Sequence, residues 1–272
     1  MSTKTDLLER YGLDLEAAVS KLISSGNWIQ LLDISARFAA YSSQNILLLF
    51  SQACSRGFSP TLVAGYRGWQ RLGRQVKAGE KALYIVAPKM RKASSWQVAP
   101  EEDFQVLIGF RMVGVFDLCQ TMGDDLAMPP QPQLLDSESP LIPALVQRLI
   151  KLMDVRGFSV EFEPLDGANG LTDFESTSVK VRSDVPSLQQ LKTLLHETAH
   201  VLLHQHRLVS RGEAELEAES CAYVVCRALG FDSSSYSFPY VARWSLGDID
   251  LVCRVVRSVH HTAREIIKFL EE

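Results

Sequence analysis

Residues 196–200 read His-Glu-Thr-Ala-His, and this pentapeptide constrains the chain more than any other segment. Two histidines four positions apart on an α-helix project from the same face, so one divalent ion can bind both imidazoles. A glutamate directly after the first histidine is the base that a hydrolytic zinc site requires. The pattern therefore predicts a helix with His196 and His200 as metal ligands and Glu197 as the catalytic carboxylate.

The residues around the pentapeptide favour such a helix. Ser187 follows a proline and precedes Gln190 by three positions, which is the pattern of a capping box at a helix start. A step of about 100° per residue gathers the apolar side chains in one stripe, formed by Leu188, Leu191, Leu195, Ala199 and Leu202. The two histidines lie beside that stripe, so the helix can bury its leucines and present its imidazoles to a cleft. The alternative is a solvated helix face that happens to hold two histidines.

A second helix, expected from Glu213 to Leu229, contains four glutamates at alternate positions. The helical projection places Glu215 and Glu219 within its apolar stripe, where an unpaired carboxylate costs several kcal/mol. We therefore expect Glu215 to be the third metal ligand. We expect Glu219 to orient a ligand histidine through its other ring nitrogen, although the two roles could be exchanged. Glu217 is predicted to face solvent.

Two histidines and one carboxylate leave a fourth tetrahedral position for water, which distinguishes a catalytic zinc from a structural one. The ion lowers the pKa of that water toward neutrality, and Glu197 is placed to accept its proton. The implied reaction is hydrolysis of a peptide or amide bond in an unidentified protein or peptide substrate. Zn²⁺ is the expected ion, with Mn²⁺ as the alternative.

A predicted strand, a third histidine and a group of polar residues near the motif each have alternative interpretations. The alternating segment 176–181 is predicted as a strand, either an edge strand that aligns an extended peptide or one that only covers the core. His204 lies beyond the reach of the metal and is predicted to cap the helix or lie on the surface. Four residues are candidates for stabilising the oxyanion: Tyr223, His206, Tyr236 and His260.

Length and composition are those of a soluble globular protein. The chain has 272 residues, of which 46% are hydrophobic and 22% charged, with a formal net charge of −4. Uninterrupted apolar runs such as 46–50 are far too short to cross a membrane, and the amino terminus does not resemble a secretory signal. Five scattered cysteines without a Cys-x-x-Cys pair fit reduced thiols. We therefore expect a cytoplasmic protein without a membrane partner.

The proline-rich stretch 127–133 marks a break between two domains, because it can continue neither a helix nor a central strand. We expect a first domain over 1–126, a linker over 127–140 and a metal domain over 141–272. Helical spacing covers 14–25 and 31–54 in the first domain. In the second domain the pattern predicts a strand at 158–162 and helices at 141–155, 240–244 and 248–270.

The stretch from Arg56 to Lys92 has nine basic residues against one acidic residue, in a chain that is acidic overall. Such asymmetry is typical of a surface that binds a polyanion, and aromatic residues lie among the charges. Bases can stack on aromatic rings while basic side chains follow the phosphates, as in single-stranded DNA binding. The candidate DNA contacts are Tyr66, Arg67, Trp69, Arg71, Arg74, Lys77 and Lys81. The alternatives are a solvated basic loop and a core position for Trp69.

Several segments resemble a known family. The amino-terminal single-stranded-DNA-binding domain of the ArdC anti-restriction family is similar to 40–49, 64–81, 85–88 and 115–123. The zincin-type metallopeptidase domain of the same family, which is also similar to the ImmA/IrrE metallopeptidases, resembles 194–204 and 215–224. The resemblance implies an α+β fold, with a small DNA-binding domain followed by a zincin-like HExxH domain. It also implies His196, His200 and Glu215 as ligands and Glu197 as the catalytic glutamate.

The role that the resemblance implies is protection of incoming DNA from host restriction during horizontal transfer. One alternative is a regulatory metalloprotease of the ImmA/IrrE kind that cleaves a repressor. Another is a DNA-binding protein whose metal site is inactive.

Overall fold

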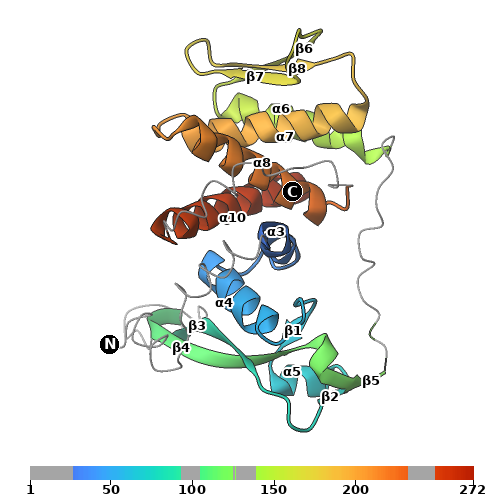
Figure 1. The fold of residues 1–272 in the computed structure, drawn as a ribbon, viewed down its shortest axis with the longest axis vertical. Helices are drawn as coiled ribbons and strands as arrows, with labels where there is room; N and C mark the ends of the chain where they lie inside the picture. The colour runs from blue at the N-terminus through green and yellow to red at the C-terminus, as the bar shows by residue number, and fades with distance from the viewer. Residues whose placement is uncertain (1–26, 93–104, 125, 127–138, 232–248) are drawn as a thin grey trace, which may run out of the picture. The chain divides into compact units, whose positions relative to one another are not determined.

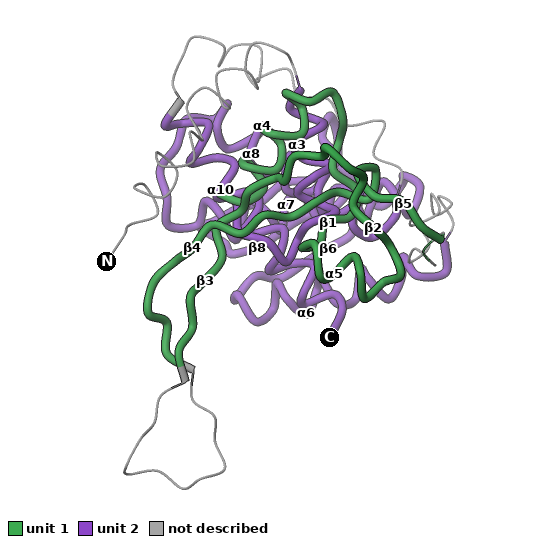
Figure 2. The backbone as a smooth tube through the Cα atoms, turned by 90° about the horizontal axis from the view of Figure 1, so that it is seen from below, with its two compact units in different colours: residues 1–19, 44–126 green, residues 20–43, 127–272 purple. Residues whose placement is uncertain are grey.

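The computed structural model describes residues 27–92, 105–124, 126, 139–231 and 249–272 (Figure 1). These residues divide into two compact units (Figure 2). Unit 1 is drawn from 44–126, and unit 2 from 27–43 and from the residues after 138. Both units mix helices and strands, so the expected α+β class is confirmed. The helices expected at 14–25 and 240–244 and the proline-rich stretch lie outside the described residues.

Unit 1 contains two small antiparallel sheets. The first has the strand order β1-β4-β3 and the second pairs β2 with β5. The elements are α4 (Ser43–Cys54), β1 (Val63–Ala64), α5 (Tyr66–Arg71), β2 (Arg74–Val76), β3 (Leu83–Lys92), β4 (Gln105–Asp117), the 3-10 turn η1 (Leu118–Gln120) and β5 (Thr121–Gly123).

Helix α4 covers the free edge of β3 with two side-chain amides. The amide of Asn45 donates to the carbonyl of Val86 and accepts from its N–H, both at 2.9 Å. Gln52, two helical turns later, makes the same pair of bonds to Tyr84, at 2.9 and 2.8 Å. An edge strand exposes unpaired backbone groups, and these two amides satisfy them in place of another strand.

Unit 2 holds the expected metal helices. Its sheet has the order β6-β8-β7, with β6 parallel and β7 antiparallel to the central β8. The sheet lies on one side of α6 and α7, and α8, α10 and α3 lie on the other side (Figure 1). The elements are α3 (Trp28–Arg37), α6 (Leu141–Val155), β6 (Ser159–Glu163), β7 (Gly170–Asp173), β8 (Ser178–Arg182), α7 (Ser187–His204), α8 (Arg211–Ala228) and α10 (Ile249–Glu271).

The prediction of one helix over 31–54 is wrong, because residues 38–42 separate two helices, α3 and α4. The structure also places α3 in unit 2, whereas the sequence assigns it to a first domain over 1–126. The reason is a set of polar contacts with α8. The indole of Trp28 donates to the hydroxyl of Ser220 at 3.0 Å. The carboxylate of Asp33 accepts from both Tyr223 and Arg227, each at 2.9 Å.

The helices expected at 141–155 and 248–270 are confirmed as α6 and α10. The strand expected at 176–181 forms as β8, but it is the central strand of its sheet, so it cannot be the edge strand that receives a peptide. The two edge strands of this sheet are β6 and β7. Within the described ranges no helix is both long and apolar enough to cross a membrane.

Candidate metal centre

Helix α7 supplies the two histidines. The helix begins at Ser187, which was predicted to be the N-cap residue. Pro186 takes that position instead and makes no side-chain cap hydrogen bond, so the predicted capping box does not form. The side-chain amide of Gln190 instead donates to the carbonyls of Ser183 and Val185, at 3.0 and 2.8 Å. These bonds hold the loop that connects β8 to α7. The leucines expected to face the core at 191 and 195 are buried.

Helix α8 starts after a short turn that folds it back against α7. The hydroxyl of Ser210 caps its first turn by accepting from the N–H of Glu213 at 3.2 Å. This turn explains how only fourteen intervening residues bring Glu215 opposite His200.

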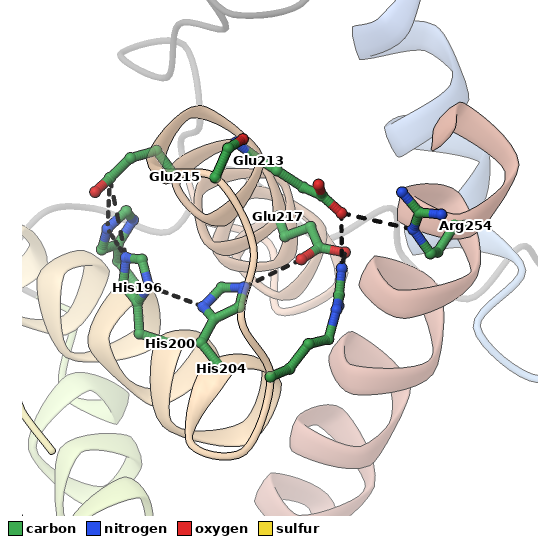
Figure 3. Close-up of polar contacts among 9 residues, drawn as sticks. His196, His200, His204, Glu213, Glu215, Glu217 and Arg254 are labelled. Carbon is green, nitrogen blue, oxygen red and sulfur yellow. Dashed lines mark hydrogen bonds and ion pairs between the residues drawn. The ribbon is translucent and has the colours of Figure 1, made fainter. Parts of the chain in front are cut away.

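Three side-chain atoms converge where the two helices meet (Figure 3). The Nε2 atoms of His196 and His200 lie 3.0 Å apart. The Oε2 atom of Glu215 lies 3.5 Å from the first and 3.9 Å from the second. Bonds of about 2.0–2.1 Å to a tetrahedral zinc would separate neighbouring ligand atoms by roughly 3.3 Å. The three groups therefore match the donor set and the spacing of a divalent-ion site.

Glu219 contacts the other side of the first ligand. Its Oε2 atom lies 3.1 Å from the Nδ1 atom of His196, one helical turn beyond Glu215 on α8. A carboxylate at this ring nitrogen fixes which nitrogen carries the proton and leaves Nε2 free for a metal. Among the described residues, only the set with Glu215 brings three ligand atoms within 4.8 Å of one another.

The carboxylates and imidazoles strongly perturb one another. Burial lowers the pKa of His196, but the hydrogen bonds with Glu215 and Glu219 outweigh it and raise that pKa to about 9. Burial and the neighbouring charge of His196 lower the pKa of His200 to about 3. The two imidazoles therefore differ in how readily they take up a proton, and a divalent ion bound there would compete with protons.

Glu197 lies beside the triad on a cavity of about 420 Å³. Its Oε2 atom accepts a hydrogen bond of 2.6 Å from the hydroxyl of Thr172 on β7, and burial raises its pKa. Strand β7 runs so close that a Cβ atom at Gly170 would lie 2.5 Å from the Oε1 atom of Glu197. The cavity is lined by Asn169, Gly170, Gln189, Lys192, Thr193, His196, Glu197 and Glu219.

The prediction that Glu217 faces solvent is wrong. Its side chain is fully buried and binds His204 and Arg207. Helix α8 is packed by α7, α10 and α3, so the side that the projection assigned to solvent lies inside unit 2. Glu215 and Glu219, which the projection buried, have side chains that are 34% and 31% exposed because they border the site.

His204 is also misplaced by the sequence, since its side chain is buried between His200 and Glu217 (Figure 3). Its position four residues after His200 is the signal that marks it. Two of the oxyanion candidates have other partners: Tyr223 donates to Asp33, and the Nε2 atom of His260 donates to the carbonyl of Tyr41. Of the other two candidates, His206 is exposed and Tyr236 lies outside the described residues.

The candidate DNA contacts separate into two groups in unit 1. Trp69 cannot stack on a base, because its side chain is 0% exposed and its indole donates to the carbonyl of Phe116 at 2.9 Å. Arg74 and Lys77 donate to Thr121 and to the carbonyl of Cys119, which ties them to the fold. The exposed members are Tyr66, Arg67, Arg71, Lys77 and Lys81, although the amine of Lys77 is bound to that carbonyl. Beside α5 lies an open hollow of about 530 Å³ that includes Gln70, Gln75 and Met122.

Known proteins match both parts of the chain. Residues 15–116 match the family model described as the N-terminal domain of anti-restriction factor ArdC. An uncharacterized protein from Bacillus anthracis is 24% identical over 295 residues, which cover 92% of this chain and 48% of that protein. The chain thus spans about half the length of this curated relative.

Two solved structures share the fold. The metal-free crystal structure of antirestriction ArdC from the R388 plasmid is 18% identical with a TM-score of 0.57, and the match covers 94% of this chain and 96% of that one. The Mn(II)-bound structure of the same protein is 19% identical with a TM-score of 0.51, covering 89% and 96%. The amino-terminal part of this chain thus matches the model of the ArdC N-terminal domain, and most of the chain shares the fold of ArdC from the R388 plasmid.

Proposed function

We propose that this chain is a metal-dependent peptidase of the zincin type, joined to a unit that binds single-stranded DNA, and that it protects incoming DNA from restriction. The observation that carries the enzymatic part is the convergence of His196, His200 and Glu215, with Glu197 beside them on the same cavity. The match of residues 15–116 to the N-terminal domain of anti-restriction factor ArdC supports the anti-restriction role.

The donor set suits a catalytic ion. Two imidazoles and one carboxylate leave a coordination position for water or substrate, and Zn²⁺ and Mn²⁺ both accept such ligands. The related ArdC structure with Mn(II) supports a divalent ion in this fold. An ion held there would supply Lewis-acid activation of water and of the substrate carbonyl.

With an ion bound, three other residues would each have a separate role in hydrolysis. Glu197 takes the proton from the attacking water and returns it to the leaving amine, which requires a carboxylate held at a fixed position on the cavity wall. Thr172 provides that position through its 2.6 Å hydrogen bond. Glu219 keeps the ring of His196 oriented by accepting from its Nδ1 atom.

Strand β7 supports an extended peptide as the substrate. Among the described residues it pairs with β8 alone, so its other edge is available to a further strand, and its first residue, Gly170, lines the cavity. A peptide that adds to this edge would be aligned by main-chain hydrogen bonds, largely independent of its sequence.

The α5 face of unit 1 supports DNA binding. Tyr66 is 45% exposed, and its hydroxyl is held by the side chain of Gln75 at 2.6 Å, which fixes a ring on which a base can stack. Arg67 and Arg71 flank it on the same short helix and can follow the phosphates. With Trp69 buried, Tyr66 is the aromatic residue of this helix that DNA can reach.

Two variants test the proposal. Glu197→Gln keeps all three ligands, so Mn²⁺ and Zn²⁺ binding measured by calorimetry should persist while cleavage of unfolded casein is lost. His200→Ala should lose both. A wild-type chain that binds neither ion would overturn the enzymatic part.

Anti-restriction is tested separately, by the survival of unmodified plasmid DNA that enters a restricting host together with each variant. Protection that persists with Glu197→Gln would assign the role to DNA binding alone. Protection that is absent with the wild-type chain would overturn it.

A further inference from the structure

The row of polar side chains in Figure 3 does not end at the candidate metal centre. The Nδ1 atom of His200 lies 3.0 Å from the Nδ1 atom of His204, one turn further along α7. The Nε2 atom of His204 lies 3.1 Å from the Oε2 atom of Glu217 on α8. The side chains of His204 and Glu217 are 6% and 0% exposed, so water does not compete for these contacts.

A second layer holds Glu217. Its Oε1 atom accepts from both terminal nitrogens of Arg207, at 3.1 and 3.0 Å. Arg207 also donates to Glu213 at 2.8 Å, and Arg254 from α10 lies 3.6 Å from the same Glu213 oxygen. A fully buried carboxylate is tolerated only when it is paired and hydrogen-bonded, and Arg207 provides both.

Only one arrangement of donors and acceptors along this row leaves the Nε2 atom of His200 unprotonated and able to bind a metal. The carboxylate of Glu217 can only accept, so the Nε2 atom of His204 carries a proton. The Nδ1 atom of neutral His204 is then an acceptor, and the Nδ1 atom of His200 donates to it. The Nε2 atom of His200 therefore keeps its lone pair, and this atom is the one that faces His196 and Glu215.

The two ligand histidines are thus oriented in different ways. The carboxylate of Glu219 contacts the Nδ1 atom of His196 directly, whereas the Nδ1 atom of His200 is linked to the carboxylate of Glu217 through the imidazole of His204. We propose that His204 and Glu217 are positioning residues that fix the tautomer and the ring orientation of His200 for a divalent ion. The inference rests on the proposed metal centre and assigns these two residues a part in it.

Partners in this position usually change metal affinity by about 10- to 100-fold. His204→Phe fills the space but removes the acceptor, so the affinity for Mn²⁺ and Zn²⁺, measured by chelator competition, should fall within that range. His204→Gln keeps an acceptor oxygen and should recover most of the affinity. The metal affinity of Glu217→Gln should lie between the affinities of His204→Phe and His204→Gln. The matched control is His206→Gln, an exposed histidine two residues away, which should leave affinity unchanged.

Nitrogen NMR of the imidazoles in the metal-free protein gives a second readout that a merely structural role would not move. His200 should carry its proton on Nδ1 in the wild type and in His204→Gln, and should lose this preference in His204→Phe. Thermal unfolding of the metal-free variants detects any that do not fold, and His204→Gln and Glu217→Gln then carry the test.

The outcomes separate the two proposals. A wild-type chain without metal affinity overturns the proposed enzyme. Normal wild-type affinity together with His204→Phe and Glu217→Gln within twofold of it overturns the role of the positioning residues alone. A His200 ring protonated on Nε2 in the metal-free wild type overturns that role as well.

Discussion

The hydroxyl of Thr172 donates to the carboxylate of Glu197 at 2.6 Å, joining the edge strand β7 to the helix that carries both ligand histidines. One bond therefore links the strand that borders the cavity to the group expected to move the proton. The orientation of Glu197 depends on a residue that no metal motif contains.

Thr172→Val keeps the shape of the side chain and removes the donor, so Glu197 loses its fixed position. We expect peptidase turnover to fall about tenfold or more, in keeping with the 10²- to 10⁴-fold contribution of general base catalysis. Metal affinity should not change, because Thr172 contacts none of the three ligands. Thr172→Ser retains the hydroxyl and is the control. Equal turnover in the valine and serine variants would refute this role.

Gly170→Ala tests a second residue of β7 that lies close to the carboxylate of Glu197. A Cβ atom there would lie 2.5 Å from the Oε1 atom of Glu197 and 2.6 Å from a methyl carbon of Thr193. Because such distances are too short for any real contact, Glu197 or the strand must shift. We expect strongly reduced turnover, with metal affinity retained, in calorimetry and cleavage assays run on the same preparation. Gly167→Ala, in the preceding loop, is a control for general effects on stability.

Helices α6, α7 and α10 of unit 2 were predictable because each shows one apolar stripe over many turns. The pairing of His196, His200 and Glu215 follows from this, since residue spacing on two packed helices determines which side chains meet. Glu217 was not predictable in the same way. A helix that packs on several sides has no solvated side, and its own sequence does not reveal how many neighbours surround it.

The prediction of one helix over 31–54 failed for a related reason. The spacing over 31–54 is compatible with one helix, but the contacts of Trp28 and Asp33 with α8 hold α3 in unit 2. Tertiary hydrogen bonds between residues about 190 positions apart leave no periodic trace in the sequence. Gly170 and Thr172 were missed because they act through distance to Glu197, and no spacing rule on β7 encodes that distance.

His260 gives unit 2 an acid-sensitive contact. Its Nε2 atom donates to the carbonyl of Tyr41 at 2.7 Å, and among the described residues its buried Nδ1 atom has no hydrogen-bond partner. Burial lowers the pKa of His260, so the unfolded chain takes up a proton at a higher pH than the folded chain does. Its contribution to stability is full above the ordinary pKa of about 6.5 and is lost as the pH falls below it.

His260→Gln keeps a donor and removes this titration. We expect the free energy of unfolding, measured by urea titration between pH 8 and pH 5, to fall less steeply in the variant. The difference in slope should not exceed about 1.4 kcal/mol per pH unit, the value for one proton. The control is His261→Gln at the exposed neighbouring position, which should retain the wild-type slope. Parallel curves for wild type and His260→Gln would show that the group does not titrate differently on folding.

Removing the metal should affect unit 2 selectively. An ion that binds only the folded chain stabilises it by about 2.7 kcal/mol at a hundredfold excess over its dissociation constant. Addition of a chelator to the loaded protein should therefore lower the melting temperature. His200→Ala should show no response to the chelator, because its site lacks a ligand. A chelator response in that variant would locate the ion elsewhere.

Tyr66 and Trp69 lie three residues apart on α5, and the structure gives them opposite roles. Trp69→Ala removes a fully buried indole and should destabilise unit 1 by about 3–5 kcal/mol, as measured by thermal unfolding.

Tyr66→Ala should leave the fold intact and weaken binding of labelled single-stranded DNA by about 1–3 kcal/mol, whereas Tyr66→Phe keeps the ring and should bind almost normally. Affinity should also fall steeply with salt, because Arg67 and Arg71 would follow the phosphates. If Tyr66→Ala bound as tightly as the wild type, or duplex DNA bound more tightly than a single strand, the α5 face would not be the nucleic-acid surface.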